Sequence, residues 1–427
     1  MNQGTKYTYV DLFSGAGGMT EGFEASGKFE GLAHIDWEMP MVRTLRHRLC
    51  QLHNLSEEEA QRKTIHMDLQ LHDELLHGIK NAKLKNKYKN NHPDFMNGGL
   101  VGNDRTKGIL GDRKVDLVIG GPSCQAYSIA GRAQDEYGMK KDYRNFLFES
   151  FVKIVKVLKP KIFVFENVPG MLSAKPNDEF VTELVFRAFK QAGYEILKPS
   201  EMKEHALFDM SEYGVPQTRK RLIIIGILAG KACRNSQLKD IYKKINRLKK
   251  NKKRTVRMTI GSMPKLFPLP PNKRIHRVSH VLKGKNNFCN HNPRFHNNRD
   301  IAIFKKWIKG RFNKKGATVQ IAFYNSQKYI TKKTKQGTKH GKYRNLEFDM
   351  PSPTIVAHIH KDGLMFIHPD VKQARSLTVR ECAKLQTFPD DFQFIEADGS
   401  NYKMIGNAVP PIFAFQLSKV IKSYLSE

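Results

Sequence analysis

Short apolar runs alternate with amphipathic stretches between residues 7 and 228, a pattern typical of α/β domains in which strands alternate with helices. The runs that predict strands are YTYVDLF (7–13), GLAHI (31–35), VDLVIGG (115–121), KIFVFEN (161–167) and RLIIIGIL (221–228). Apolar positions at helical spacing predict one helix that begins near residue 19 and three more over about 40–50, 145–158 and 179–192. We therefore expect a doubly wound α/β domain over residues 1–228.

Three further regions are distinguished by composition, and the first of them lies within the α/β domain. Residues 69–114 are rich in lysine, asparagine and glycine, which predicts a surface insertion that is too polar for the core. Residues 229–345 are strongly basic and predict a second, smaller domain inserted into the first. Residues 346–427 are globular in composition, with helices expected over 378–386 and 410–425. We expect them to form a junction segment and a final helix that returns to the first domain.

The whole chain has a formal net charge of +32, and nearly all of this charge comes from one region. Residues 231–345 hold 33 lysines and arginines but only Asp240 and Asp300, whereas the other 312 residues hold 40 basic and 39 acidic residues. Such a block is either a nucleic-acid surface or a solvated, partly disordered insert. Stretches such as IAIFKKWIKGRF (301–312) interleave basic residues with apolar residues that can build a core, which favours nucleic acid.

Cysteine use and hydropathy indicate the compartment. The five cysteines are widely spaced and form no CxxC motif, so they predict no disulfide framework and fit a reducing environment. The N-terminus has no apolar leader, and no stretch approaches the roughly 18 apolar residues of a membrane span. We expect a cytoplasmic monomer.

The glycine-rich turn DLFSGAGG (11–18) suggests a ligand near the first strand, because glycine lets the backbone approach a ligand. A tight strand-to-helix turn also needs glycine without any ligand. Asp36 follows at the distance at which a carboxylate can hold ribose hydroxyls, and Asp68 could accept a hydrogen bond from an adenine amine. Trp37 offers a flat face to an adenine. The GxGxxG spacing is not met, which favours an adenosyl ligand without a pyrophosphate over NAD.

A second group of residues suggests catalysis. Cys124 follows the strand 115–121 directly behind a Gly-Gly-Pro-Ser turn, where α/β sheets place ligands and a following helix can lower a thiol pKa. The alternative is a small buried hydrophobe. Glu166 lies at the end of the next apolar run, and Arg219 and Arg221 lie two apart on a later strand, so they share a face. We expect thiol, carboxyl and guanidinium to converge. The alternative is a structural Glu–Arg pair beside an unrelated cysteine.

With these residues identified, the chain resembles the DNA (cytosine-5)-methyltransferases of bacterial restriction-modification systems. Six blocks occur in the order of that family: DLFSGAGG, GGPSCQAYS, ENVPG, QTRKR, TVRECAKLQTFPDDF and GNAVPP. The resemblance covers nearly the whole chain outside 229–345. It implies a Rossmann-like domain that binds S-adenosylmethionine, with 229–345 as a target-recognition domain for duplex DNA.

The resemblance also implies a role for each catalytic candidate. Cys124 matches the nucleophile that attacks carbon 6 of a cytosine swung out of the duplex, which activates carbon 5 toward the methyl group. Glu166 matches the residue that contacts ring nitrogen 3 and the exocyclic amine. Arg221 matches the contact to the cytosine carbonyl oxygen, and Arg219 matches the arginine that orients Glu166 and the substrate.

The residues that match the family's methyl-donor site come from several parts of the chain. They are Phe13, Ala16 and Gly18 in the first loop, Asp36, Trp37 and Asp68 at the ribose and adenine, Leu147 against the adenine, and Asn407 and Val409 in the closing segment. Two positions depart from the family pattern. Ser123 stands where a proline usually precedes the nucleophile, and Asp36 stands where glutamate is more usual.

Other functions and partners stay open at this level. An RNA (tRNA) cytosine-5 methyltransferase shares the core but usually lacks so large and basic an insert. A non-catalytic DNA-binding protein that keeps the fold would not need Cys124 and Glu166. A cognate restriction endonuclease is expected from the resemblance alone. We expect no metal, because the histidines and Cys289 within 276–296 fit no common zinc spacing.

Overall fold

The chain forms two compact units in the computed structural model. The structure describes residues 6–122, 147–176, 178–230, 235–274, 277–310, 344–361 and 363–426. The first unit comprises 1–215, 219–252 and 408–427, and the second comprises 216–218 and 253–407. The domain boundaries expected from composition, at 228/229 and 345/346, stay a prediction.

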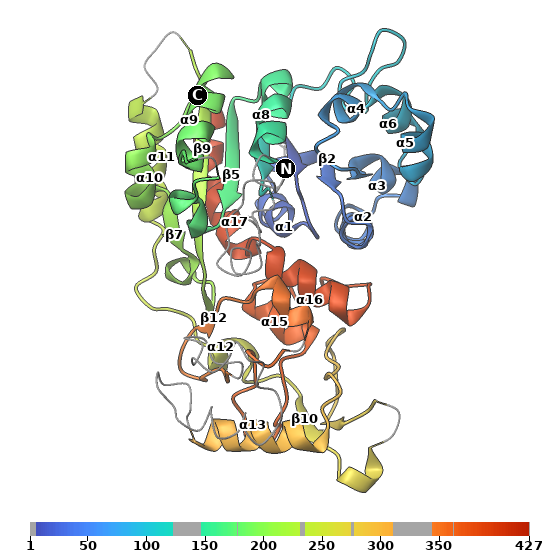
Figure 1. The fold of residues 1–427 in the computed structure, drawn as a ribbon, viewed down its shortest axis with the longest axis vertical. Coiled ribbons are helices and arrows are strands. Elements are labelled where there is room, and N and C mark those ends of the chain that lie inside the picture. The colour runs from blue at the N-terminus through green and yellow to red at the C-terminus, as the bar shows by residue number, and fades with distance from the viewer. Residues whose placement is uncertain are drawn as a thin grey trace, which may run out of the picture. The chain divides into compact units, whose positions relative to one another are not determined.

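The first unit is built on an eight-stranded sheet (Figure 1). Its strands follow the order β3-β2-β1-β4-β5-β9-β6, and β7 pairs with β9 beside this path. The strands from β3 to β5 in this order pair in parallel, whereas β9 is antiparallel to β5, β6 and β7. The expected doubly wound α/β fold is confirmed. The bounds are β1 Tyr7–Leu12, β2 Phe29–Asp36, β3 Thr64–His66, β4 Leu117–Gly120, β5 Ile162–Asn167, β6 Tyr194–Glu195, β7 Leu207–Asp209 and β9 Lys220–Leu228.

The strand order reverses between β1 and β4. From β1 the chain adds β2 and β3 on one side, and later β4 and β5 on the other. Ligands of such sheets bind beyond the carboxyl ends of the strands at this reversal. The register places Leu12 beside Gly120, and Gly120 beside Phe165. The turns after β1, β4 and β5 therefore begin along one edge of the sheet, which we call the switch edge.

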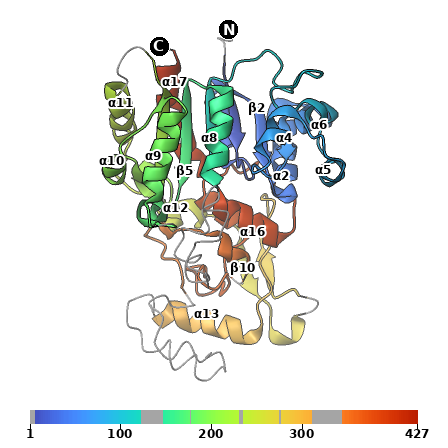
Figure 2. The same cartoon turned by 45° about the horizontal axis from the view of Figure 1, so that its top comes forward.

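Helices cover both faces of this sheet. α8 (Leu147–Leu158) packs against α9 (Val181–Gln191), and Figure 2 shows both in front of β5 with α17 behind it. α1 (Gly18–Ala25) packs against α17 (Pro411–Leu425), which also contacts α11 (Asn235–Asn246). The other described elements of this unit are α2 Met39–His53, α3 Glu57–Lys63, α4 His72–His77, α5 Ala82–Lys87, α6 Pro93–Gly98, α10 Pro199–His205, η3 Pro169–Ser173 and η4 Met210–Tyr213.

The segment 69–114 contributes to the core of the first unit. Leu75, Tyr88, Phe95 and Leu100 are buried and belong to the main hydrophobic cluster. The expectation that this segment is too polar for the core was wrong. Most of its lysine and asparagine side chains face solvent, and their number hides the few apolar positions that anchor it.

The second unit has its own hydrophobic cluster. α13 (Asn298–Gly310) places Phe304 and Trp307 against Leu364 and Ile367. The other described elements are β8 Gln217–Thr218 paired with β12 Ser352–Pro353, the antiparallel pair β10 Lys265–Pro268 and β11 His280–Lys283, α12 Val256–Ile260, α15 Val379–Leu385, α16 Asp398–Asn407, η5 Pro271–Lys273 and η7 Ala357–His360. Within the described ranges of the whole chain, no helix combines the length and apolar character needed to cross a membrane.

Candidate active site

An ion pair at the switch edge joins two of the candidate catalytic residues. The antiparallel pairing of β5 and β9 sets the end of β5, with Glu166, opposite the start of β9. Arg221 Nε lies 2.7 Å from Glu166 Oε1, and the two side chains keep 12% and 11% of their surface exposed. Arg221 Nη1 also donates to the carbonyl oxygen of Lys220 at 2.8 Å. The pair is therefore largely desolvated but still open to a ligand on one side.

Arg219 lies beneath this pair. It is fully buried, and its backbone carbonyl accepts a hydrogen bond from Met210 N at 2.8 Å. Burial lowers the pKa of Arg219 well below its usual range, and the nearby charge of Arg221 lowers it further while Glu166 opposes the shift. The resemblance gave Arg219 the role of orienting Glu166. In the structure the direct ion pair with Glu166 is made by Arg221.

The second carboxylate oxygen of Glu166 faces the turn after β4. A Cβ atom at Gly121 would lie 2.7 Å from Glu166 Oε2, closer than a side chain tolerates without a shift. Glycine at 121 therefore lets the turn pass directly over the carboxylate. Ser123 and Cys124 follow in the sequence and lie outside the described residues, so the nucleophile assigned to Cys124 stays a prediction.

The glycine-rich turn after β1 is held by the end of β2. Asp36 Oδ2 accepts a hydrogen bond from Gly15 N at 2.9 Å, and its Oδ1 accepts from Glu38 N at 2.8 Å. Phe13 and Gly17 have φ angles of 60° and 83°, in the left-handed region that bends the chain sharply. The Asp36 carboxylate thus fixes the turn that leads into α1.

Trp37 and Asp68 continue the same edge. Trp37 is 55% exposed, and its carbonyl oxygen lies 2.9 Å from His66 Nε2. Met67 N donates to the carbonyl oxygen of Asp36 at 2.9 Å, which brings the half-buried Asp68 next to the end of β2. An exposed indole beside carboxylates offers a stacking face and hydrogen-bond acceptors to an adenosyl group. Leu147 is the buried first residue of α8.

Gly18 and Val409 meet through tight packing. A Cβ atom at Gly18 would lie 2.4 Å from the carbonyl oxygen of Val409, and one at Gly22 would lie 2.4 Å from that of Pro411. These glycines lie one turn apart on α1 and therefore share one face of the helix. Because neither has a side chain, the backbone just before and at the start of α17 can approach this face closely. Packing therefore explains Gly18 without a ligand. Ala16 is buried in the same turn.

Asn407 belongs to a different part of the structure from the other cofactor candidates. It is the exposed last residue of α16, in the second unit, whereas the candidates named above lie in the first unit. Its predicted place in the closing segment of the methyl-donor site stays a prediction.

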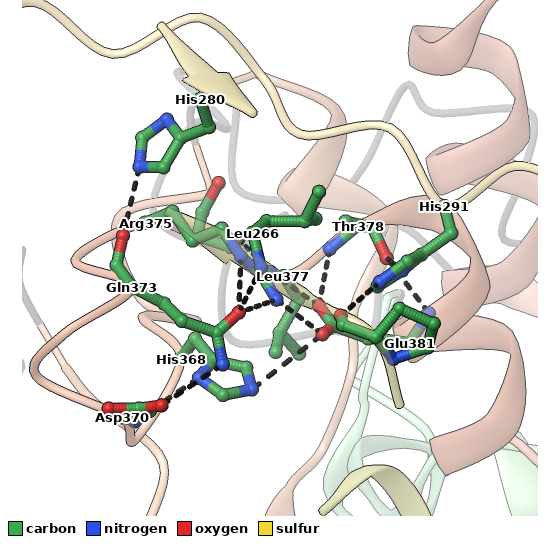
Figure 3. Close-up of polar contacts among 12 residues, drawn as sticks. Leu266, His280, His291, His368, Asp370, Gln373, Arg375, Leu377, Thr378 and Glu381 are labelled. Atoms are coloured by element: carbon green, nitrogen blue, oxygen red, sulfur yellow. Dashed lines mark hydrogen bonds and ion pairs between the residues drawn. The ribbon is translucent and has the colours of Figure 1, made fainter. Parts of the chain in front are cut away.

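The second unit contains a buried ionic network (Figure 3). Arg375 Nη1 donates to Glu381 Oε2 at 2.7 Å, and Arg375 Nη2 donates to Glu381 Oε1 at 2.6 Å. Glu381 also accepts from the backbone of Thr378, the N-cap of α15, at 2.8 Å. Arg375 donates further to Gln373 Oε1. Burial alone would raise the pKa of Glu381, but Arg375 outweighs it and lowers the pKa to about 2.

Three histidines of the basic region contact other protein groups. His280 Nε2 lies 2.9 Å from the carbonyl oxygen of Gln373, and His291 Nδ1 lies 3.0 Å from Thr378 Oγ1. His296 Nε2 lies 3.1 Å from Ser376 Oγ. Among the described residues, no three histidine, cysteine or acidic side chains gather as a metal site would require. These histidines connect the loops of 280–296 to the network.

Comparison with known proteins identifies the family. Residues 80–423 match the family model described as C-5 cytosine-specific DNA methylase. The chain belongs to this family. The protein is therefore a DNA methyltransferase, and the resemblance seen in the six sequence blocks is confirmed.

Similar proteins support this membership. The type II methyltransferase M.Bpa9945I of Bacillus paralicheniformis is 30% identical, with 98% of this chain and 99% of the relative covered. The type II methyltransferase M1.HphI of Haemophilus parahaemolyticus is 28% identical, with 97% and 86% covered. The solved structure of the Entamoeba histolytica methyltransferase EhMeth matches the methylase with a TM-score of 0.54 at 14% identity, covering 99% and 100%. This last likeness supports the fold alone.

One polar group of the methylase was missed from the sequence. Thr20 Oγ1 donates to Asp11 Oδ2 at 2.7 Å and lies 3.1 Å from His34 Nδ1, all within the core below the glycine-rich turn. Burial raises the pKa of Asp11 to about 8, although the hydrogen bond from Thr20 opposes this. The available signal was an acid in the middle of the apolar run YTYVDLF. The group ties β1, α1 and β2 together, so it supports the turn that carries the donor-site candidates.

Proposed function

We propose that the methylase transfers a methyl group from S-adenosylmethionine to carbon 5 of a cytosine swung out of duplex DNA. The observation that carries this proposal is the ion pair of Glu166 and Arg221 at the switch edge. Its free side lies against Gly121, three residues before Cys124 in the sequence. A carboxylate and a guanidinium held together in a largely dry site suit the polar edge of a pyrimidine ring.

Each catalytic residue has a distinct task in this proposal. The Cys124 sulfur bonds to carbon 6 of the cytosine, and the electron pair of the ring double bond becomes available at carbon 5. Glu166 holds ring nitrogen 3 and the exocyclic amine and shares a proton with the ring as negative charge develops. Arg221 donates to the ring carbonyl oxygen. Carbon 5 takes the methyl group from the donor's sulfonium sulfur, which is left as a neutral thioether. A water molecule then accepts the carbon 5 proton, the bond between Cys124 and carbon 6 breaks, and the ring is restored.

Arg219 acts as a positioning residue in the proposal. Its burial beneath the pair and the hydrogen bond to its carbonyl from Met210 fix the start of β9, from which Arg221 projects.

The proposed donor site combines Phe13, Ala16, Gly18, Asp36, Trp37, Asp68, Leu147, Asn407 and Val409. S-adenosylmethionine carries its methyl group on a positively charged sulfur, which makes the group transferable to a carbon nucleophile. The exposed Trp37 supplies a stacking face, and the Asp36 carboxylate lies beside it, where it accepts hydrogen bonds from Gly15 N and Glu38 N. These features suit an adenosyl group.

The proposed biological setting is a restriction-modification system. Two relatives, M.Bpa9945I and M1.HphI, carry the name type II methyltransferase. We infer a cognate endonuclease with the same target, target recognition by 229–345, and a monomer that works in the cytoplasm. The family match is to DNA methylases, which does not favour the RNA substrate or the non-catalytic alternative.

The test is methyl transfer from labelled S-adenosylmethionine to unmethylated duplex DNA, with bisulfite sequencing of the product. Wild type should place label at carbon 5 of cytosine within one short motif. Cys124→Ser should lower the rate by about a thousandfold or more while the protein still binds the donor, because the nucleophile is lost. A folded, donor-binding wild type that transfers no label to DNA would contradict the proposal, and structured RNA would be tried next.

A further inference from the structure

α11 carries more positive charge than its place in the fold requires. Leu238, Ile241, Tyr242 and Ile245 anchor the helix in the core of the first unit. The stretch 239–252 that includes this face holds seven lysines and arginines and one acid, Asp240. Basic residues near a helix C-terminus stabilise the helix dipole, but one or two are enough for that effect.

Part of this charge is neutralised within the unit. Lys244 lies 3.3 Å from Asp240 and its ammonium stands over the ring of Tyr424. Lys239 pairs with Glu201 at 2.8 Å, and Lys249 pairs with Glu212 at 2.8 Å. Contacts within the protein therefore explain these lysines as structural residues.

Four exposed basic side chains remain, and we call them the basic strip: Lys243, Arg247, Lys250 and Lys252. In the part of the chain that the structure describes, no acidic side chain forms an ion pair with any of them. Lys243 and Arg247 lie four residues apart on one helical row, about 6 Å along the axis. This is under two phosphate steps of a DNA strand, which rises about 3.4 Å per step.

The end of α11 is fixed close to the switch edge. Tyr213 Oη donates to Asn246 Oδ1 at 3.2 Å, and Lys250 N donates to the carbonyl oxygen of Glu212 at 2.7 Å. Both partners belong to η4, whose Met210 N donates to the carbonyl oxygen of Arg219. The basic strip is therefore connected, through one short turn, to the residues before the start of β9.

We propose that the basic strip binds phosphates of the duplex that flank the swung-out cytosine. This rests on the proposed function, and it assigns sequence-independent DNA contacts to the first unit in addition to the basic segment of the second. Phosphate contacts hold a duplex in register without reading its sequence. Such contacts next to the switch edge would help to hold the duplex while the target base leaves the stack.

The experiment compares two variants with the same loss of charge. The test variant carries Lys243→Gln, Arg247→Gln, Lys250→Gln and Lys252→Gln. The control carries Lys80→Gln, Lys83→Gln, Lys85→Gln and Lys89→Gln, four exposed lysines around α5. Binding to a fluorescent duplex is measured by anisotropy over a salt series, and methyl transfer to unmethylated plasmid is measured at saturating DNA.

The salt dependence should separate the variants. Each phosphate contact contributes about 0.9 to the slope of log K against log salt, so the test variant should lose about 3 and the control less than about 1. Binding by the test variant should weaken at least about tenfold at moderate salt, with turnover at saturating DNA within about twofold of wild type. Lys252→Glu, which lies outside α11, provides a second variant without risk to the helix and should lower the slope by about 1 or more.

The outcomes distinguish this inference from the proposed function. Equal slope changes in the test and control variants, with normal methyl transfer by wild type, would overturn the role of the basic strip alone. Wild type that binds the duplex but transfers no methyl group would overturn the proposed function, whatever the two slopes. Unchanged binding by Lys252→Glu would also count against the strip.

Discussion

The two units each contain a carboxylate–guanidinium pair, and the pairs differ in how completely they are satisfied. In the second unit, Arg375 and Glu381 have side chains 0% and 1% exposed and bind each other through two hydrogen bonds. In the first unit, Arg221 and Glu166 share one close contact and keep 12% and 11% exposure. The Arg375–Glu381 pair of the second unit has no capacity left for a ligand, whereas the Arg221–Glu166 pair of the first unit has.

This difference separates a structural pair from a candidate catalytic pair. Thr378 N and Gln373 occupy the remaining positions around the Arg375–Glu381 pair. At the switch edge, the backbone of Gly121 passes directly over Glu166 Oε2. Sequence alone left open whether Glu166 and its arginine were merely structural. The pair at the switch edge keeps a little exposed surface, whereas the Arg375–Glu381 pair keeps almost none, and this favours a role toward substrate for Glu166.

The largest expected effect is loss of stability in the second unit. Glu381→Ala leaves the guanidinium of Arg375 buried without its partner, which should cost about 3–5 kcal/mol. Urea unfolding can be followed by the fluorescence of Trp307, buried in α13, after Trp37→Phe removes the other tryptophan. Adding Arg375→Met should recover much of the loss. A change below about 1 kcal/mol in the single variant would show that the two pairs are not different in kind.

The next effect should fall on catalysis rather than stability. Glu166→Gln keeps the shape of the side chain but removes the charge that Arg221 and the cytosine ring require. We expect turnover to fall about 100-fold, equivalent to about 2.7 kcal/mol, with less than about 1 kcal/mol change in unfolding free energy. Single-turnover methyl transfer and urea unfolding measure the two quantities. A destabilised variant with normal turnover would assign this pair to structure as well.

The smallest of these effects concerns pH and again concerns the second unit. His368 Nε2 lies 3.6 Å from Glu381 Oε1, and burial together with the charge of Arg375 lowers the pKa of His368 to about 3. The folded unit keeps His368 neutral while the unfolded chain takes up a proton below about pH 6.5, so stability falls as pH falls. Between pH 7 and pH 5 this should cost ~2 kcal/mol.

The control for the pH effect is His368→Gln. That variant should lose ~2 kcal/mol less over the same interval in Trp307-detected urea unfolding. Below about pH 4.5, Glu381 adds a second loss, because its carboxylate is stabilised in the folded unit down to a pKa of about 2. If His368→Gln shows the same drop as wild type between pH 7 and pH 5, another group is responsible.

Much of the first unit could be predicted because its signals are local. The apolar runs at 7–13 and 161–167 correspond closely to β1 and β5, and the amphipathic stretch 145–158 to α8. Glu166 was identifiable as an acid at the end of a buried run. The Glu166–Arg221 ion pair is less evident from the sequence, because it joins side chains of β5 and β9, which only the antiparallel pairing of these strands brings together.

The second unit was less predictable because its contacts join distant segments. His280, His291 and His296 contact Gln373, Thr378 and Ser376, roughly 80 to 90 positions away along the chain. No periodic pattern in the sequence predicts such pairings. The spacing of the histidines indicates only that they fit no common zinc motif. The core residues of 69–114 were missed for a related reason, because a few isolated apolar positions hardly change the average composition of a polar segment.

The packing of α1 on α17 has a consequence for the synthesis of the methylase. The turn with Phe13 and Gly17 leads into α1, and the face of α1 made by Gly18 and Gly22 packs against the backbone of Val409 and Pro411. A chain emerging from the ribosome completes nearly four hundred residues between these two surfaces. The glycine face of α1 therefore has no partner until the segment that contains Val409 has been synthesised, although Asp36 and Thr20 can already hold the preceding turn.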